Sequence, residues 1–249
     1  MRFVSEDGAV AHERVLVVIP AWNERDALPS VLAEMREALP EVSVVVVDDG
    51  SVDGTAAVAE SLGVRALRMP FNVGVGGAMR AGFLYAQREG FDYVVQVDAD
   101  GQHNPADVER LLEVAHAGND VVVGSRFSGV GDYTVRGPRM WAMRVLSWSV
   151  SSIAGTRLRD VTSGFRLSGP RAIELFARAY PPEYLGDTVE SLILAHRAGL
   201  AIEQVPVAMR SRVAGTPSQN PFKSTLYLAR AGLVLALAVL REPPAKDRL

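Results

Sequence analysis

The sequence contains no cysteine and almost no lysine. The absence of cysteine excludes disulfides, thiolate metal sites and cysteine nucleophiles. Of the 26 basic residues only Lys223 and Lys246 are lysine, so nearly all positive charge comes from arginine, the better bidentate partner for phosphate. The net charge of −3 and the lack of a basic stripe interleaved with aromatic residues give no indication of a nucleic-acid partner.

Long hydrophobic runs are lacking too. The apolar stretch Ala231–Leu240 is ten residues long, whereas a membrane-spanning helix needs about 20. Residues 1–13 lack the apolar central region of a secretory signal peptide. We therefore expect a cytoplasmic protein in which Phe222–Leu240 forms a helix that lies at a membrane interface or contacts another copy of the chain.

Apolar runs and amphipathic segments alternate through most of the 249 residues. Continuous Val/Ile runs between helix-like segments are typical of a mostly parallel sheet covered by helices on both faces, an α/β fold. The sequence predicts strands at 15–20, 42–47, 64–69, 93–97, 120–124 and 202–207, and helices at 27–39, 54–62, 76–88, 105–117 and 140–153, with a mobile loop at 129–138. We expect a flexible tail over residues 1–14, one domain over 15–220, and a C-terminal helix with a polar tail over 221–249.

Two carboxylates follow the predicted strand 93–97 directly. Asp98 and Asp100 are one residue apart, and Gln102 and His103 come just beyond them. The carboxyl ends of parallel strands are where open α/β sheets bind ligands. Mg²⁺ is usually held by one or two carboxylates together with substrate phosphates. The pair therefore indicates a cation site, although a solvated acidic turn is the simpler reading of such a pair alone. His103 is a candidate metal ligand or base.

Four further polar segments each follow a predicted strand, at 20–24, 48–55, 72–78 and 124–126. Asp49 is placed to accept hydrogen bonds from a nucleobase or ribose, while Ser51 or Asp53 could instead cap the next helix. The glycine-rich segment 72–78 is similar to a dinucleotide fingerprint, but Met79 stands where the third glycine is required. We expect its backbone, at Gly76, to approach a nucleotide.

As an ordered set, these segments resemble the motifs of family-2 glycosyltransferases of the GT-A fold. The matching residues are Pro20-x-x-Asn23-Glu24, Asp48-Asp49-Gly50-Ser51, Asn72-x-Gly74, Asp98-Ala99-Asp100 and Gly124-Ser125-Arg126. The second half is similar to the polyprenyl-phosphate (dolichol-phosphate) mannose and glucose synthases, through Thr162-Ser163-Gly164-Phe165-Arg166, Glu190, and Val205-Pro206-Val207 followed by Arg212-x-x-Gly215. The resemblance extends from about Val15 to Gly215.

The resemblance implies an enzyme that takes a hexose from a UDP- or GDP-sugar with inversion, with Mg²⁺ or Mn²⁺ as cofactor. It places the metal on Asp98, Asp100 and Gln102, where the ion would neutralise the leaving diphosphate. It places the donor on Pro20, Ala21, Asn23, Glu24, Asp49, Ser51, Asn72, Gly76, Asp98 and Ala99. Asp100, Glu190, Arg126 and Arg212 are the expected catalytic residues, the arginines because guanidinium groups bind phosphate bidentately.

The acceptor decides whether a general base is needed. A sugar hydroxyl requires a carboxylate to take its proton, and Glu190 or Asp187 would be the candidates. A polyprenyl phosphate is already anionic and needs only positioning, for which the candidates are Arg139, Arg144, Ser147 and Arg166. The chain departs from the synthases at Pro217-Ser218, where the family has Ser-Lys, and at Met143, where many members have arginine.

We therefore expect a hexose transferase that acts on a polyprenyl phosphate at the cytoplasmic face of the membrane. Its expected partners are the nucleotide sugar, the polyprenyl phosphate, a membrane surface or small membrane protein, and a second copy of the chain. Two alternatives remain open at this point. One is a soluble transferase that glycosylates a saccharide or small-molecule hydroxyl, and the other is a non-catalytic subunit that binds nucleotide sugars.

Overall fold

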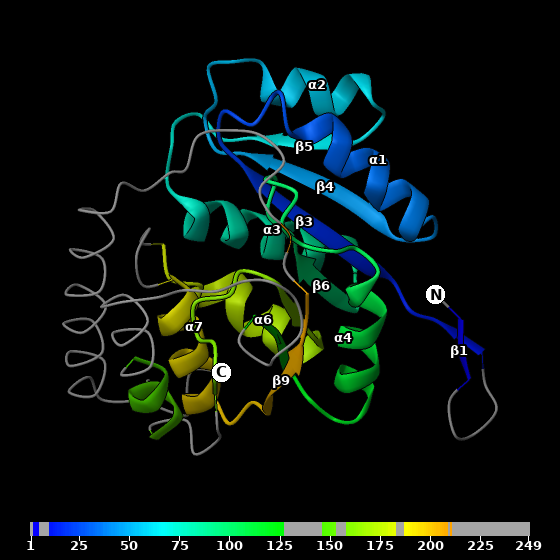
Figure 1. Cartoon of the computed structure of the whole chain (residues 1–249). Helices are drawn as coiled ribbons and strands as arrows, with labels where there is room; N and C mark the ends of the chain where they lie inside the picture. The colour runs from blue at the N-terminus through cyan, green and yellow to red at the C-terminus, as the bar shows by residue number, and fades with distance from the viewer. Residues whose placement is uncertain are drawn as a thin grey trace.

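The structure is a computed structural model, and it describes residues 2–4, 10–126, 146–152, 158–182, 187–208 and 210. Its centre is a seven-stranded sheet in the order β5-β4-β3-β6-β8-β7-β9 (Figure 1). The strands are β3 (Val15–Ala21), β4 (Ser43–Asp48), β5 (Arg65–Arg68), β6 (Tyr93–Gln96), β7 (Val121–Ser125), β8 (Arg166–Ser168) and β9 (Ile202–Pro206). All neighbours pair in parallel except β8, which runs antiparallel between β6 and β7. The expected mostly parallel sheet is confirmed.

Helices cover both faces of this sheet (Figure 1). They are α1 (Leu28–Ala38), α2 (Thr55–Ser61), α3 (Val75–Glu89), α4 (Asp107–His116), α6 (Pro170–Ala179) and α7 (Asp187–Arg197), and residues 146–152 are helical as well. Leu16 and Val18 of β3 face the cluster formed with α3, α6 and α7, while Val17 faces the cluster formed with α1 and α4. Because β3 is buried on both faces along nearly all of its length, its sequence is continuously apolar.

The amino-terminal residues differ from the expected tail in their secondary structure. Two short strands, β1 (Arg2–Val4) and β2 (Val10–His12), pair there in antiparallel register. Among the described residues, no helix has the length and apolar character needed to cross a membrane. The loop predicted at 129–138 and the C-terminal helix predicted within 221–249 lie outside the residues that the structure describes.

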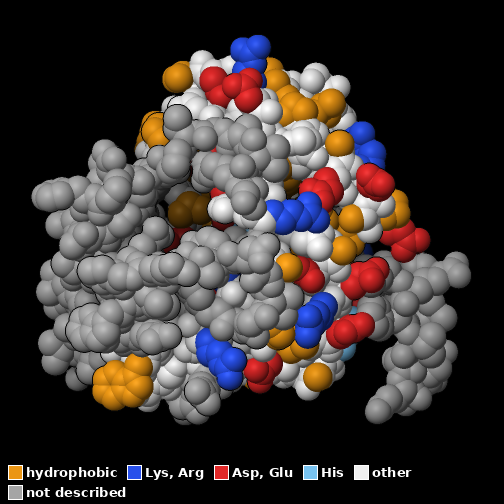
Figure 2. Space-filling view, in the orientation of Figure 1, with side chains coloured by type: hydrophobic (Ala, Val, Ile, Leu, Met, Phe, Trp, Pro, Cys, Tyr) orange, Lys and Arg blue, Asp and Glu red, His pale blue; other side chains and the backbone are white. Residues whose placement is uncertain are grey.

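The face shown in Figure 2 carries the helices α1 and α4. Acidic and basic side chains are interspersed there, and hydrophobic side chains are scattered among them (Figure 2). Such a mixture is typical of a solvated surface. The polar motifs of the sequence lie instead at the edge of the sheet where the parallel strands end.

The antiparallel strand β8 decides which residues meet at that edge. The parallel strands β3, β4, β6 and β7 all end there, at Ala21, Asp48, Gln96 and Ser125. Since β8 runs the opposite way, it begins at this edge, and its first residue, Arg166, pairs with Gln96. The segment 160–165 that leads into β8 is therefore brought beside the motif that follows β6.

Candidate functional site

The loops after β3 and β4 are joined by hydrogen bonds between backbone and side-chain atoms. The backbone N–H of Asn23 donates to Ser51 Oγ at 2.9 Å, and Asn23 Oδ1 accepts from the N–H of Val52 at 3.0 Å. Glu24 N–H donates to Thr55 Oγ1 at 3.0 Å. Asn23 has φ of 55°, a conformation that asparagine tolerates better than most residues. The bonds between these loops therefore involve three of the residues expected to bind the donor, namely Asn23, Glu24 and Ser51.

Asp49 ties the third loop, which follows β5, to the second. Its side chain is buried, and its two carboxylate oxygens accept the N–H groups of Val73 and Gly74, each at 2.8 Å. Gly50 is required at this junction because its φ is +72° and a Cβ would lie 2.6 Å from Phe71 C. Asp49 was expected to bind a nucleoside. The structure shows that it holds the loop that carries the exposed Asn72.

Gly76, which was expected to approach a nucleotide, packs closely against Pro181 and Asp187. A Cβ at this position would lie 2.2 Å from the carbonyl oxygen of Pro181 and 3.2 Å from Asp187 Cβ. The first turn of α3 therefore packs directly against the residues before α7. This contact accounts for the glycine by protein packing, and an approach of Gly76 to the donor stays a prediction.

Asp98 and Asp100 lie in the turns after β6, next to the buried Ala99. The side chain of Asp98 is 38% exposed, and its Oδ1 accepts a hydrogen bond from Gln96 Nε2 at 3.2 Å. Asp100 is buried, and its Oδ1 accepts from the N–H of Gln102 at 3.0 Å. Gln102 Nε2 in turn donates to the carbonyl oxygen of Arg210 at 3.2 Å.

The donor set of this motif fits a hard divalent cation that is shared with substrate. Asp98, Asp100 and Gln102 offer carboxylate and amide oxygens, the ligands that Mg²⁺ and Mn²⁺ prefer. Within the described part of the chain, no three His, Cys, Asp or Glu side chains are grouped to hold a metal by themselves. A site of two carboxylates needs further oxygens, and a diphosphate supplies them.

A third carboxyl group, Asp187, lies buried at the start of α7. Burial raises its pKa to about 6; the positive charge of Arg166 opposes this shift, and the negative charge of Asp98 adds to it. Among the described residues, Asp187 Oδ2 has no hydrogen-bond partner. Glu190, the other candidate base, is half-buried on the same helix. Asp187 lies close enough to Asp98 for the negative charge of Asp98 to contribute to its raised pKa.

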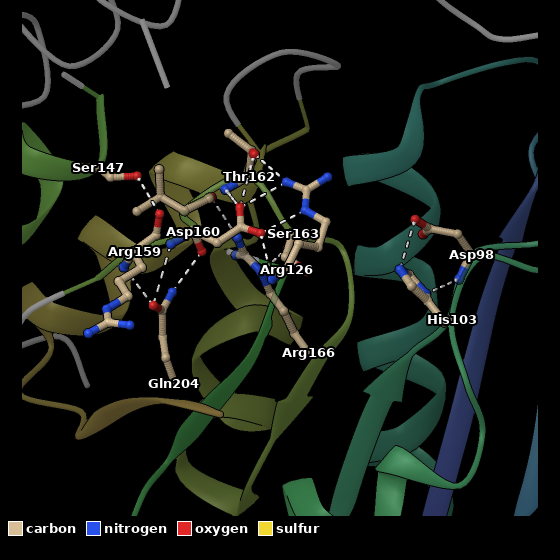
Figure 3. A network of polar contacts seen from close by, with 11 residues as sticks. Asp98, His103, Arg126, Ser147, Arg159, Asp160, Thr162, Ser163, Arg166 and Gln204 are labelled. Atoms are coloured by element: carbon tan, nitrogen blue, oxygen red, sulfur yellow. Dashed lines mark hydrogen bonds and ion pairs between the residues drawn. The ribbon is translucent and has the colours of Figure 1, made fainter. Parts of the chain in front are cut away.

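Arg126, expected to bind phosphate, is paired with a buried acid (Figure 3). Its Nε and Nη2 donate to the two oxygens of Asp160 at 2.6 and 2.8 Å, and Nη2 also reaches Thr162 Oγ1 at 2.6 Å. Burial alone would raise the pKa of Asp160, but the hydrogen bonds and charge of Arg126 outweigh it and lower that pKa. The Nε–Nη2 edge of the guanidinium is therefore already occupied by Asp160.

Arg166 and Ser147, both expected at the acceptor, also bond to protein atoms. Arg166 is buried, and its guanidinium donates to the carbonyl oxygens of Val161, Ser163 and Thr188 and to Ser191 Oγ, at 2.7 to 2.9 Å. Ser147 Oγ donates to the carbonyl oxygen of Arg159 at 3.1 Å. These bonds fix the segment 158–166, and a direct contact of either residue with the acceptor stays a prediction.

Three of the predicted site residues, Arg139, Arg144 and Arg212, lie outside the described residues. Conversely, the sequence did not single out Asp160, Gln204 or Arg210. Gln204 Nε2 donates to the carbonyl oxygen of Asp160 at 2.7 Å, and Arg210 pairs with Gln102 through its backbone (Figure 3 shows the former pair). Gln204 and Arg210 bond to residues that are 44 and 108 positions away in the chain, so a local sequence pattern cannot predict these contacts.

Comparison with curated proteins finds relatives that match most of the chain. Polyprenol monophosphomannose synthase of Mycolicibacterium smegmatis is 33% identical, over 84% of this chain and 82% of its own length. Undecaprenyl-phosphate mannosyltransferase of Micrococcus luteus is 36% identical, over 81% and 86%. Dolichyl-phosphate beta-glucosyltransferase of Dictyostelium discoideum is 29% identical, over 86% and 71%.

Solved structures support the fold. Glucosyl-3-phosphoglycerate synthase of Mycobacterium tuberculosis, determined with Mn²⁺, UDP and phosphoglyceric acid, matches with a TM-score of 0.70 at 23% identity, over 94% of this chain and 81% of the other. The expected GT-A fold is thereby confirmed. The model of the family described as glycosyl transferase family 2 matches residues 16–174. On this match and the relatives above, the chain belongs to glycosyl transferase family 2.

Proposed function

We propose that this protein transfers a hexose from a UDP- or GDP-sugar to the phosphate of a polyprenyl phosphate, with inversion, at the inner face of the cell membrane. The observation that carries the proposal is the similarity, over about four fifths of the chain, to relatives whose names specify polyprenol or undecaprenyl phosphate mannosylation. The mannose in those names favours GDP-mannose as the donor to test first, and the dolichyl-phosphate glucosyltransferase makes UDP-glucose the second.

The residues of the site have defined tasks in this reaction. The interlocked loops around Asn23, Ser51 and Asp49 form a rigid wall for the nucleoside. Asp98, Asp100 and Gln102 would hold Mg²⁺ or Mn²⁺, which supplies charge neutralisation at the diphosphate when bound. Because Asp98 is partly exposed while Asp100 is buried, Asp98 is the carboxylate that meets incoming donor first.

The acceptor phosphate needs no general base, since its oxygen is already ionised near neutral pH, with a second pKa near ~6 by analogy with phosphorylated side chains. The chain must instead hold this anion near the sugar, and the arginines Arg139, Arg144 and Arg212 are the proposed cationic partners. Arg126 and Arg166, both engaged by protein oxygens, would act by supporting the loop that faces the acceptor.

The test is a product assay with the purified full-length chain. GDP-mannose and UDP-glucose are each offered with a short polyprenyl phosphate and Mn²⁺ or Mg²⁺, and the lipid product is identified by mass spectrometry. The matched control is the corresponding polyprenol, which lacks the phosphate. Transfer to the phosphate but not to the alcohol is expected, and transfer to the alcohol or to neither would contradict the proposal.

One observation favours a second candidate. Asp187 is a buried carboxyl group whose pKa is raised to about 6 and whose Oδ2 has no partner in the described structure. A base of this kind would suit an acceptor hydroxyl, as in a transferase acting on a saccharide. Including soluble saccharides in the same assay, with Asp187→Asn as the variant, separates the two: only a hydroxyl acceptor would make turnover depend on ionised Asp187.

A further inference from the structure

His103 is a buried histidine directly beneath the exposed carboxylate of Asp98. Its side chain is 1% exposed, and its ring stacks on Phe165 with a centroid distance of 4.9 Å and an interplanar angle of 26°. Phe165 is itself confined, because a Cβ on Gly124 would lie 2.6 Å from its Cδ1. The imidazole is therefore held in one plane by tight packing between β7, the start of β8 and the turn after β6.

The hydrogen bonding of the ring determines where its proton lies. The backbone N–H of Asp98 donates to His103 Nδ1 at 3.1 Å, so Nδ1 must act as an acceptor. A neutral imidazole has one acceptor and one N–H donor, which places the proton on Nε2. Nε2 faces Asp98 Oδ2 at 3.7 Å, a favourable electrostatic contact beyond hydrogen-bond distance (Figure 3). One ring thus contacts both the backbone and the carboxylate of the same aspartate.

The carboxylate of Asp98 is bracketed from its other sides as well. Gln96 Nε2 donates to Oδ1 at 3.2 Å. Gly164 lies against the same carboxylate and leaves little free space beside it. A Cβ at this position would lie 3.0 Å from Asp98 Oδ2 and 3.1 Å from Oδ1. Asp98 therefore keeps one orientation while its outer side stays open.

We propose that His103 is a positioning residue that presents Asp98 to the divalent cation, and that it does not itself ligate the metal. This inference rests on the proposed function. Direct ligation is disfavoured because Nδ1 is occupied by the Asp98 N–H and Nε2 carries the proton. Groups that orient a ligand in this way typically change metal affinity by about 10–100-fold when they are replaced.

Two amide substitutions separate the two nitrogens of His103. In His103→Asn the side-chain oxygen can replace Nδ1 as acceptor for the Asp98 N–H, but the donor that faces Asp98 Oδ2 is lost. In His103→Gln the longer amide can place an N–H near the position of Nε2. The proposal predicts that the Mn²⁺ dissociation constant rises about 10-fold or more in His103→Asn and by a smaller factor in His103→Gln.

The measurement is Mn²⁺ binding to the full-length chain by electron paramagnetic resonance of free Mn²⁺, at saturating UDP or GDP, with thermal melting of each variant. His116→Gln is the matched control, since His116 also contacts an aromatic ring, Tyr93, but bonds to Glu13. It should leave Mn²⁺ affinity unchanged. Unchanged affinity in both His103 variants, equal losses in both, or a loss in His116→Gln would overturn the proposal.

The experiment also distinguishes this inference from the proposed function. If wild-type protein binds Mn²⁺ and forms the lipid product while the His103 variants bind Mn²⁺ equally well, only the role of His103 is wrong. If wild-type protein binds Mn²⁺ with the variants ranked as expected but forms no lipid product, the acceptor is wrong and the positioning role stands. Wild-type protein that binds no Mn²⁺ with nucleotide overturns both the metal site and the inference.

Discussion

At the scale of single residues, the site is made of side chains whose neighbours define their chemistry. Asp98, Asp100 and Asp187 are three carboxyl groups at one edge of the sheet, yet only Asp98 has a substantially exposed side chain. Asp100 is tied to the Gln102 N–H, and burial raises the pKa of Asp187. The same residue type is therefore suited to different tasks at positions that differ in burial and in hydrogen bonding.

Asp98→Asn and Asp100→Asn should each remove most transfer activity while the fold stays intact, because each removes one anionic oxygen ligand from the diphosphate site. The loss should exceed the ~10–100-fold typical of a lost supporting residue. Steady-state kinetics with Mn²⁺ titration and circular dichroism measure the two effects. Glu174→Gln, which removes an exposed charge on α6, is the control and should be neutral. Full activity in either aspartate variant or in excess chelator would exclude the metal site.

Asp187 should make stability depend on pH. The folded-state pKa of about 6 lies above the ordinary value of 3.8, so the folded protein binds more protons than the unfolded chain between these values. The free energy of unfolding should thus fall as pH rises from about 4 to about 6, by up to about 3 kcal/mol. Asp187→Asn should be more stable than wild type at pH 8 and nearly equal at pH 4 in urea denaturation. A stability difference that does not change with pH would show that folding does not raise the pKa of Asp187.

At the scale of helices and strands, the first half of the fold could be predicted from apolar runs. The strand predicted at 15–20 is Val15–Ala21, and the helix predicted at 76–88 is Val75–Glu89. These elements are readable because long buried runs and amphipathic helices leave local patterns. The short strand β8 has no such local pattern, because it has three residues and begins with a buried arginine. It is defined by its pairing with β6 and β7.

The site could be predicted to the level of its motifs but not of its contacts. The sequence placed Asp98, Asp49 and Arg126 at one edge, as the structure does. It did not show that Asp49 and Arg126 are bonded to loop atoms, because those partners, Val73 and Asp160, are 24 and 34 positions away. Such hydrogen bonds depend on where loops from different strands meet in space. Neither the spacing of motifs in the sequence nor its composition predicts those positions.

The pair Arg126–Asp160 should stabilise the junction between β7 and the loop before β8. Replacing one partner of a buried ion pair leaves an uncompensated charge, so Arg126→Ala should lower the free energy of unfolding by about 3–5 kcal/mol. The control is Glu60→Gln, which breaks a bidentate but exposed pair with Arg68 and should cost no more than about 1 kcal/mol. Urea denaturation measures both. If Arg126→Ala keeps wild-type stability but loses transfer, Arg126 belongs to the phosphate site instead.

At the scale of the whole molecule, the described loops of the proposed donor and metal site lie at the carboxyl edge of one sheet. The loops after β3, β4 and β6 and the segment that enters β8 converge there (Figure 1). A polyprenyl phosphate keeps its tail in the bilayer, so this edge has to lie near the lipid headgroups during transfer. The described residues contain no helix able to span the membrane. We propose, from its apolar sequence alone, that Ala231–Leu240 makes the contact with the membrane surface.

That contact can be tested in the full-length chain. Leu233→Glu and Leu237→Glu place charges within the apolar run, and each should weaken binding to liposomes of anionic phospholipid because carboxylates oppose insertion among headgroups. Transfer to a long-chain polyprenyl phosphate in those liposomes should slow several-fold more than transfer to a short, soluble one. Leu84→Glu, at an exposed position of α3, is the control and should leave liposome binding unchanged. If wild-type protein does not bind liposomes, the proposed membrane contact is wrong. If the variants instead lose an oligomer while liposome binding persists, the C-terminal run is an assembly contact and the membrane is reached by another surface.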